Sequence, residues 1–184
     1  MAQPTIMAMM ALIRMPWHDP RRVQTYIRNI TAALTQADPA GKAVYAKRAA
    51  DFSGKVAALD ARAAKAFAAV PAAKRKILTS HDAFGYPGER YGIRLLAVQG
   101  VSTESEASAK GVAQLVRQVR QEKVKAVFME NMSNKRLLEQ LSREAGVSIG
   151  GKLYADALSG PSGPAASYQA LFRYNVSTIL KSFN

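Results

Sequence analysis

The chain has 184 residues, a formal net charge of +13, and 48% hydrophobic residues. This length is enough for one sizeable core, and the composition is that of an ordinary folded protein, which excludes collagen-like and low-complexity classes. Cysteine is absent, which excludes disulfides and thiolate metal sites. Any metal site must therefore use nitrogen and oxygen ligands, with only His18 and His81 to supply imidazole.

The chain opens with an apolar run over residues 5–13. The run has the length of a signal-peptide core, but no basic residue precedes it and no small-residue cleavage site follows it. It is also far too short to span a bilayer. We interpret it as a buried strand or as an apolar remnant of a longer protein.

Two Asp-Pro pairs, at 19–20 and 38–39, are typical helix starts because the aspartate caps and the proline fits the first turn. Apolar residues at helical spacing predict one amphipathic helix over 20–36. The second pattern continues to Pro71, and a helix of that length would reach about 48 Å at ~1.5 Å per residue. Such a helix forms either a coiled coil or a strut between two lobes. A poor heptad register and abundant alanine favour the strut.

After Pro71, short apolar segments alternate with amphipathic ones, which is typical of a parallel sheet with helices on its faces. Strands are predicted over 76–80, 94–98, 126–130 and 148–154, and the longer helices between them over 107–122 and 135–145. A last helix is predicted to open at Pro164. The fold class is therefore α/β: a three-layer lobe with a four-stranded, mainly parallel sheet, preceded by a long connecting helix.

Polar residues follow each predicted strand at its carboxyl end, where open α/β sheets bind ligands. These residues are His81, Asp82, Glu104, Glu106, Glu130 and Asp156. Right-handed crossovers place all these ends at one edge, so His81 and Asp156 could supply half of a site for Zn²⁺ or Mn²⁺. A lone histidine at a strand end is more often a structural hydrogen-bonding residue, and Glu104 and Glu106 suit a helix N-terminus. Ligation is therefore one of two open interpretations.

No motif indicates an enzyme. The sequence has no glycine-rich phosphate loop, no nucleophile elbow and no His-Glu-x-x-His pattern. The basic residues are spread along predicted helices without interleaved aromatic residues, so we interpret them as a solvated basic surface rather than a nucleic-acid site.

Three stretches carry a family resemblance: Thr-Ser-His-Asp-Ala-Phe-Gly-Tyr at 79–86, Gln-Gly-Val-Ser-Thr-Glu-Ser-Glu at 99–106, and Gly-Gly-Lys-Leu-Tyr-Ala-Asp-Ala-Leu-Ser at 150–159. Together they resemble the zinc/manganese solute-binding proteins of bacterial ABC importers, the cluster A-I family, some of whose members are called adhesins. The resemblance is collinear from about Asp19 to the C-terminus. It implies a periplasmic protein that holds Zn²⁺ or Mn²⁺ between two lobes and delivers it to an ABC permease in the membrane. His81 matches the third family ligand and Asp156 the fourth.

The resemblance also implies a domain division and a departure from the family pattern. Residues 1–38 would be a remnant of the N-terminal lobe, 39–71 the connecting helix, and 72–184 the C-terminal metal-binding lobe. The second family ligand lies in a Pro-His-x-Trp-x-Asp-Pro pattern, whose alignment here places Met15 at the ligand position. We assign no ligand role to His18, which we interpret as a helix-start residue. With the ligands of the opposite lobe missing, a half site that binds weakly is expected.

Two other functions stay open. A non-transporting fragment could act as a protein-interaction module or a homodimer, with a second chain covering the apolar face of the long helix and the open sheet edge. A basic nucleic-acid binder ranks third and predicts salt-dependent retention on polyanions.

Overall fold

Four strands form the centre of the fold, in the spatial order β2-β1-β3-β4. The strands are β1 (Lys76–Thr79), β2 (Arg94–Ala97), β3 (Ala126–Glu130) and β4 (Ser148–Leu153). Each neighbouring pair is parallel, so the predicted sheet is confirmed and is parallel throughout. The structure, a computed structural model, describes residues 14–79, 82–97, 109–124, 126–130 and 135–183. The predicted apolar run over 5–13 and the predicted loop over 99–106 lie outside these residues.

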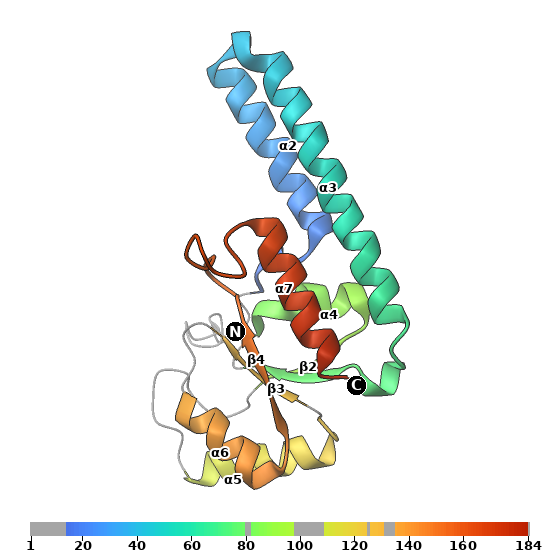
Figure 1. Ribbon diagram of the computed structural model, residues 1–184, viewed down its shortest axis with the longest axis vertical. Helices are drawn as coiled ribbons and strands as arrows, with labels where there is room; N and C mark the ends of the chain where they lie inside the picture. The colour runs from blue at the N-terminus through green and yellow to red at the C-terminus, as the bar shows by residue number, and fades with distance from the viewer. Residues whose placement is uncertain (1–13, 80–81, 98–108, 125, 131–134, 184) are drawn as a thin grey trace, which may run out of the picture.

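Helices cover both faces of the sheet, which gives the predicted three layers (Figure 1). One face carries α4 (Gly85–Tyr91), α7 (Tyr168–Lys181) and the end of α3 (Lys42–Ala68), and the other carries α5 (Ala109–Gln121) and α6 (Lys135–Ala145). Successive strand side chains point to opposite faces. Ile77 and Phe128 therefore join the cluster under α3 and α7, while Leu78 and Val127 join the cluster under α5 and α6. Burial on both faces explains why these strands are almost continuously apolar.

A helical hairpin of α2 (Pro20–Ala37) and α3 projects from this body (Figure 1). Both Asp-Pro pairs act as starts, because Asp19 accepts a hydrogen bond from the Arg21 amide at 2.9 Å and Asp38 accepts one from the Gly41 amide at 3.3 Å. The second pair opens a 3₁₀ turn, so the predicted 39–71 helix runs only over Lys42–Ala68. None of the helices in the described part of the chain has the length and apolar character needed to cross a membrane.

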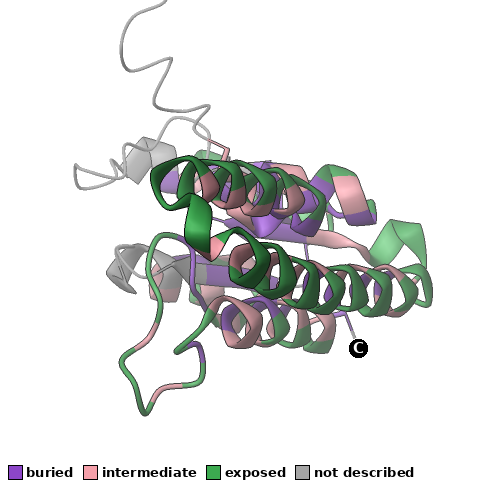
Figure 2. Ribbon diagram, turned by 90° about the horizontal axis from the view of Figure 1, so that it is seen from above, coloured by how far each residue is buried: buried purple, intermediate pink, exposed green. Residues whose placement is uncertain are grey.

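The first half of α3 is paired with α2 and does not stand alone as a strut. The Gln24 side chain donates to the Ser53 carbonyl across the two helices at 3.0 Å. The outer faces of both helices are exposed, whereas the buried residues lie toward the sheet (Figure 2). The prediction of a strut considered α3 alone, because the pattern of apolar residues in one helix does not show which other helix packs beside it.

The second half of α3 is fixed to α4 through Asp60. Its carboxylate accepts two hydrogen bonds from the Arg90 guanidinium, at 3.0 and 2.9 Å, and one from the Tyr91 hydroxyl at 2.9 Å. Burial and the nearby Asp60 charge raise the pKa of Tyr91, so the phenol stays protonated and keeps donating. The hydrogen bond to Asp60 likewise raises the pKa of Arg90. The helix after β1 is thereby held against α3.

The start of the last helix was predicted wrongly. The helix begins at Tyr168, where the Ser167 hydroxyl caps it by accepting a hydrogen bond from the Ala170 amide at 3.3 Å. Pro164 instead lies in a turn, because Ser159 and Ala165 bond to each other through two hydrogen bonds of 3.0 Å. These two bonds across six residues override the helix-start signal of the proline.

Two glycines make β4 irregular. A Cβ on Gly150 would lie 2.4 Å from the ring of Phe128, which is fully buried, and Gly151 has φ +110°, a value that side-chain-bearing residues rarely adopt. The register between β3 and β4 shifts at Val127/Phe128. Gly150 therefore leaves room for an aromatic ring from the neighbouring strand.

We predict that Gly150→Ala lowers the free energy of unfolding by about 1–3 kcal/mol, because the new methyl group overpacks a rigid core. Gly54→Ala is the matched control. Gly54 is exposed within α3 and a Cβ there meets nothing within 4 Å, so this change should stabilise by about 0.5–1 kcal/mol. Urea unfolding of the two variants measures both values. Equal effects would contradict the packing explanation.

Candidate functional site

The carboxyl ends of the four strands meet at one edge of the sheet, because all neighbouring pairs are parallel. The chain leaves β1 for β2 on one side and returns to β3 on the other, so the direction of winding reverses between β1 and β3. Open α/β sheets bind ligands at such a switch point. His81 follows β1 by two residues in the sequence. Its own placement lies outside the described residues.

Asp156 lies at the same edge, three residues after the end of β4. Its side chain is exposed, and it makes no hydrogen bond or ion pair with another described residue. Strand β3 separates β1 from β4, so the two strand axes are about 10 Å apart at ~4.8 Å per spacing. Two side chains reaching across this gap could share one ion, and the meeting of His81 with Asp156 stays a prediction.

A short segment before α2 joins the loops that follow β1 and β4. The Met15 amide donates to the Ala83 carbonyl at 3.3 Å, which fixes the segment to the loop after His81. The Trp17 indole donates to the Ala155 carbonyl at 2.9 Å, and Nε2 of His18 contacts the same oxygen at 3.0 Å. We call residues 15–18 the bridging segment. It ties together two loops that strand pairing alone leaves apart.

His18 is a structural residue, as its position before the helix predicted. It is only 3% exposed, and its ring lies 4.4 Å from the ring of Phe84, centroid to centroid. The contact with the Ala155 carbonyl requires the proton on Nε2, because a carbonyl oxygen only accepts. That nitrogen therefore cannot also bind a metal ion. The ring instead packs against Phe84, beside the core residues Phe67, Tyr91 and Phe172 of α3, α4 and α7.

The residue before Ala155 is held by Asn175 from α7. The Asn175 amide donates to the Tyr154 carbonyl at 2.8 Å and accepts from the Tyr154 amide at 3.0 Å. Asn175 is 5% exposed, so both bonds are shielded from water. The backbone that leads to Asp156 is thus fixed on one side by α7 and on the other by the bridging segment.

Sequence reasoning did not identify Asn175 and Trp17 as site residues. Asn175 lies within an otherwise amphipathic helix, where a polar residue on the buried face is a usable signal. Trp17 is the chain's one tryptophan, and its indole N–H needs a partner when it is covered. Among the described residues, no group of three His, Asp or Glu side chains is arranged to hold a metal ion.

Comparison with known proteins assigns this chain to a family. The model of the family described as "ZnuA: Zinc-uptake complex component A periplasmic" matches residues 16–182. The iron-binding protein YfeA of Yersinia pestis is 34% identical over 167 residues, which are 91% of this chain and 54% of that protein. The manganese-binding lipoprotein MntA of Bacillus subtilis is 32% identical over 161 residues, 85% of this chain and 53% of that protein. The chain spans about half the length of the curated relatives it matches.

Solved structures agree with the sequence relatives. The periplasmic zinc binding protein TroA from Treponema pallidum superposes with a TM-score of 0.82 at 28% identity, over 91% of this chain and 62% of that one. A manganese-bound mutant of the periplasmic metal binding protein from Candidatus Liberibacter asiaticus gives a TM-score of 0.81 at 30% identity, over 92% of this chain and 63% of that one. The predicted family resemblance is therefore confirmed.

We predict that Asn175→Ala destabilises the fold by about 2–4 kcal/mol, because it leaves the buried Tyr154 amide and carbonyl without partners. Asn29→Ala, an exposed change on α2, is the control and should stay within about 0.5 kcal/mol. Chemical unfolding followed by circular dichroism measures both. A small effect at Asn175 would mean that Tyr154 finds other partners.

Proposed function

Because the chain belongs to the family of periplasmic zinc-uptake complex component A proteins, we propose that it is the substrate-binding component of a metal ABC import system. Its substrate would be Zn²⁺ or Mn²⁺, captured outside the cytoplasmic membrane and passed to a membrane permease. Capture of the ion requires only its coordination, and no covalent bond is made or broken. In this proposal residues 72–184 form the metal-binding lobe and 39–71 the connection to a second lobe.

The observation that best supports this proposal is the bridging segment. Its bonds to the carbonyls of Ala83 and Ala155 hold the loop after His81 and the loop before Asp156 at one edge. A metal site needs ligands whose positions are fixed before the ion arrives, since ordering them on binding would weaken affinity. The hydrogen bonds of the segment supply that order from residues that are not ligands themselves.

The proposed ligands suit the proposed ions. His81 would give a neutral imidazole and Asp156 a carboxylate, both of which bind Zn²⁺ and Mn²⁺. Met15 stands where the family pattern has histidine, and a thioether is a poor ligand for either ion. Water would complete the coordination, so binding should be weak.

We predict that His81→Ala and Asp156→Ala each weaken Zn²⁺ binding by at least about tenfold, because each removes one of two protein ligands. Met15→His should tighten it by at least about tenfold, because it adds a third ligand next to the loop after β1. Isothermal titration with Zn²⁺ and with Mn²⁺ measures the affinities of all three variants and of the parent chain. The ion that the parent chain binds more tightly is the preferred one.

Asp51→Ala provides the control for general charge loss. Asp51 lies on α3 and pairs only with Lys47, at 2.9 Å, among the described residues. This variant should bind Zn²⁺ like the parent chain. Unchanged affinity in both His81→Ala and Asp156→Ala would overturn the proposed ligand set.

A second candidate function, docking of another polypeptide, is favoured by an apolar stripe on the hairpin. Tyr26, Ile30 and Leu34 recur every four residues along α2 and are 41%, 57% and 44% exposed. Val44, at the start of α3, is 50% exposed. Several large apolar side chains on one exposed helix face are typical of a surface that another chain covers. A second copy of this chain is the occupant that we propose.

We predict that the chain self-associates and that Ile30→Lys with Leu34→Lys makes it monomeric, because two charges would enter the covered face. Light scattering of the eluting protein measures the mass. Leu158→Lys is the control, since Leu158 is 51% exposed but lies on the loop after β4. A monomeric parent chain at high concentration would refute the dimer.

A further inference from the structure

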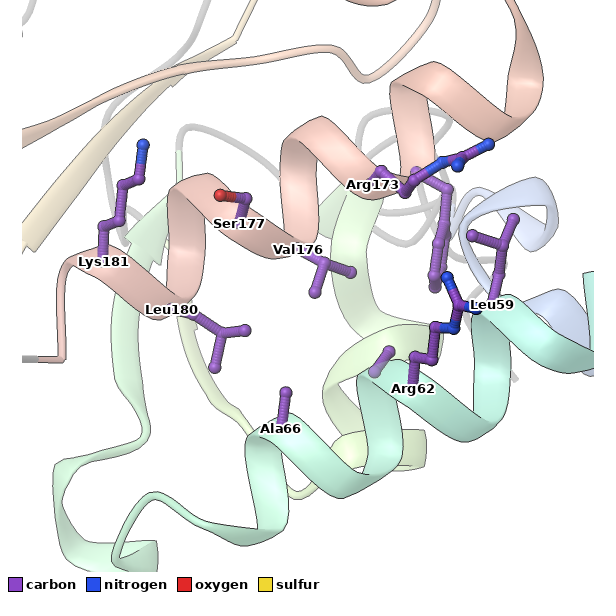
Figure 3. Close-up of a pocket in the computed structure, with 10 residues that line it drawn as sticks. Leu59, Arg62, Ala66, Arg173, Val176, Ser177, Leu180 and Lys181 are labelled. Carbon is purple, nitrogen blue, oxygen red and sulfur yellow. The ribbon is translucent and has the colours of Figure 1, made fainter.

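A groove of about 330 Å³ lies between α3 and α7, on the outer surface of the body (Figure 3). Its floor consists of apolar side chains from both helices. These are Leu59, Ala63, Ala66, Phe172, Val176 and Leu180. Two of the α3 residues that line the groove are alanines, whose short side chains leave space in front of α7. The volume is near the lower end of the range for small-molecule sites.

Three cations border this apolar floor, and no acidic residue lines the groove. Arg62 from α3 and Arg173 from α7 lie at the same end of the groove, with the Arg173 side chain extended along α7, whereas Lys181 lies at the other end (Figure 3). Arg173 bonds only to Gln169 of its own helix, at 3.2 and 3.0 Å, among the described residues. Within the same residues, Arg62 and Lys181 have neither a hydrogen bond nor an ion pair. Each of these charges can therefore bind an anion without losing a partner on another element.

We propose that this groove binds a single-chain carboxylate amphiphile, that is, a fatty acid of medium chain length. The carboxylate lies between the guanidinium groups of Arg62 and Arg173. Arg62 offers a planar fork that matches the two oxygens, and Arg173 offers Nη1, since its Nε and Nη2 donate to Gln169. The acyl chain follows the floor toward Leu180 and is removed from water there. The site is separate from the sheet edge that carries Asp156, so it does not depend on the metal-binding proposal.

The dimensions of the groove favour one acyl chain over a helix of a partner protein. The floor runs along α7 from Arg173 to Lys181, which are eight positions apart and therefore about 12 Å apart at ~1.5 Å per residue. A specific protein interface needs roughly 800 Å² on each partner, much more than this strip between two cationic borders provides. A carboxylate head with one flexible chain fits both the charge at one end and the narrow apolar floor.

Titration of the ¹⁵N-labelled chain with decanoate, kept below its micelle concentration, tests this proposal. Amide shifts are expected in residues 59–66 and 172–181. Octanoate, decanoate and dodecanoate should bind with increasing affinity, up to about fourfold for each added methylene that the floor covers. Decanol, which has the same chain without the charge, should bind more weakly.

Matched variants distinguish the groove from the overall basic charge. Arg62→Gln with Arg173→Gln should weaken decanoate binding by at least about tenfold, because two charge-assisted hydrogen bonds are lost. Arg48→Gln with Lys65→Gln removes the same charge from exposed sites on α3 outside the groove lining and should leave binding unchanged. Ala66→Leu fills the floor and should weaken binding while the arginines remain.

Four results would overturn the proposal: equal binding of decanol and decanoate, equal losses in the two double variants, shifts confined to another surface, or no decanoate response at all. Phosphatidylglycerol vesicles and an acidic amphipathic peptide are titrated in the same way as alternative ligands. Binding of either at residues 59–66 and 172–181, without a decanoate response, would assign the groove to a membrane surface or to a protein partner instead.

Discussion

The hydrogen bonds of the bridging segment to Ala83 and Ala155 are the constraint on which the candidate site depends. The strand order places β3 between β1 and β4, so no ladder bond connects the two loops that follow them. Trp17 and His18 both contact the carbonyl oxygen of Ala155, and the two contacts together use its two lone pairs. Asp19 caps α2 immediately afterwards. The same four-residue turn therefore fixes the sheet edge and the point from which the hairpin departs.

The parts of the fold that were predictable are those whose signal is local. The strands β1 and β3 are apolar runs bounded by polar residues. Asp19 marks the start of α2 because its side chain caps the helix by accepting a hydrogen bond from the Arg21 amide. The pairing of α2 with α3 was not predictable, because alanine-rich helices present several nearly equivalent faces. The turn at Pro164 was missed for a related reason, since Ser159 and Ala165 define it through bonds across six residues. Contacts of this kind leave no periodic trace in the sequence.

The candidate site divides in the same way. His81 and Asp156 stand out because ligand-type residues follow strands, and this rule places both at one edge without fixing their separation. Asn175 and Trp17 determine how the backbone before Asp156 is held, yet each does so by contacting a main-chain group rather than a recognisable partner side chain. The structural role of His18 was predictable from its place before a capped helix, and its bond to Ala155 supplies the physical reason.

Charge imposes a further condition on a chain that carries +13 and is proposed to capture a cation. Exposed charges farther than about 8 Å from a bound ion are largely screened at physiological salt, so the charges close to the site determine how strongly it attracts a cation. Near the loop after β1, Arg22 stacks on Tyr86 with its Cζ 3.6 Å from the ring centre and lies 3.8 Å from the Asp19 carboxylate. Arg14 pairs with Glu89. These pairings offset two positive charges near that loop, whereas the cations along the α3–α7 groove have no such acidic neighbours in its lining. On α3, Asp60 and Arg62 are about 200° apart around the helix at 3.6 residues per turn. One side of α3 can therefore hold α4 through a carboxylate while the other presents a guanidinium. The proposed anion-binding groove thus lies apart from the sheet edge that is proposed to bind a cation.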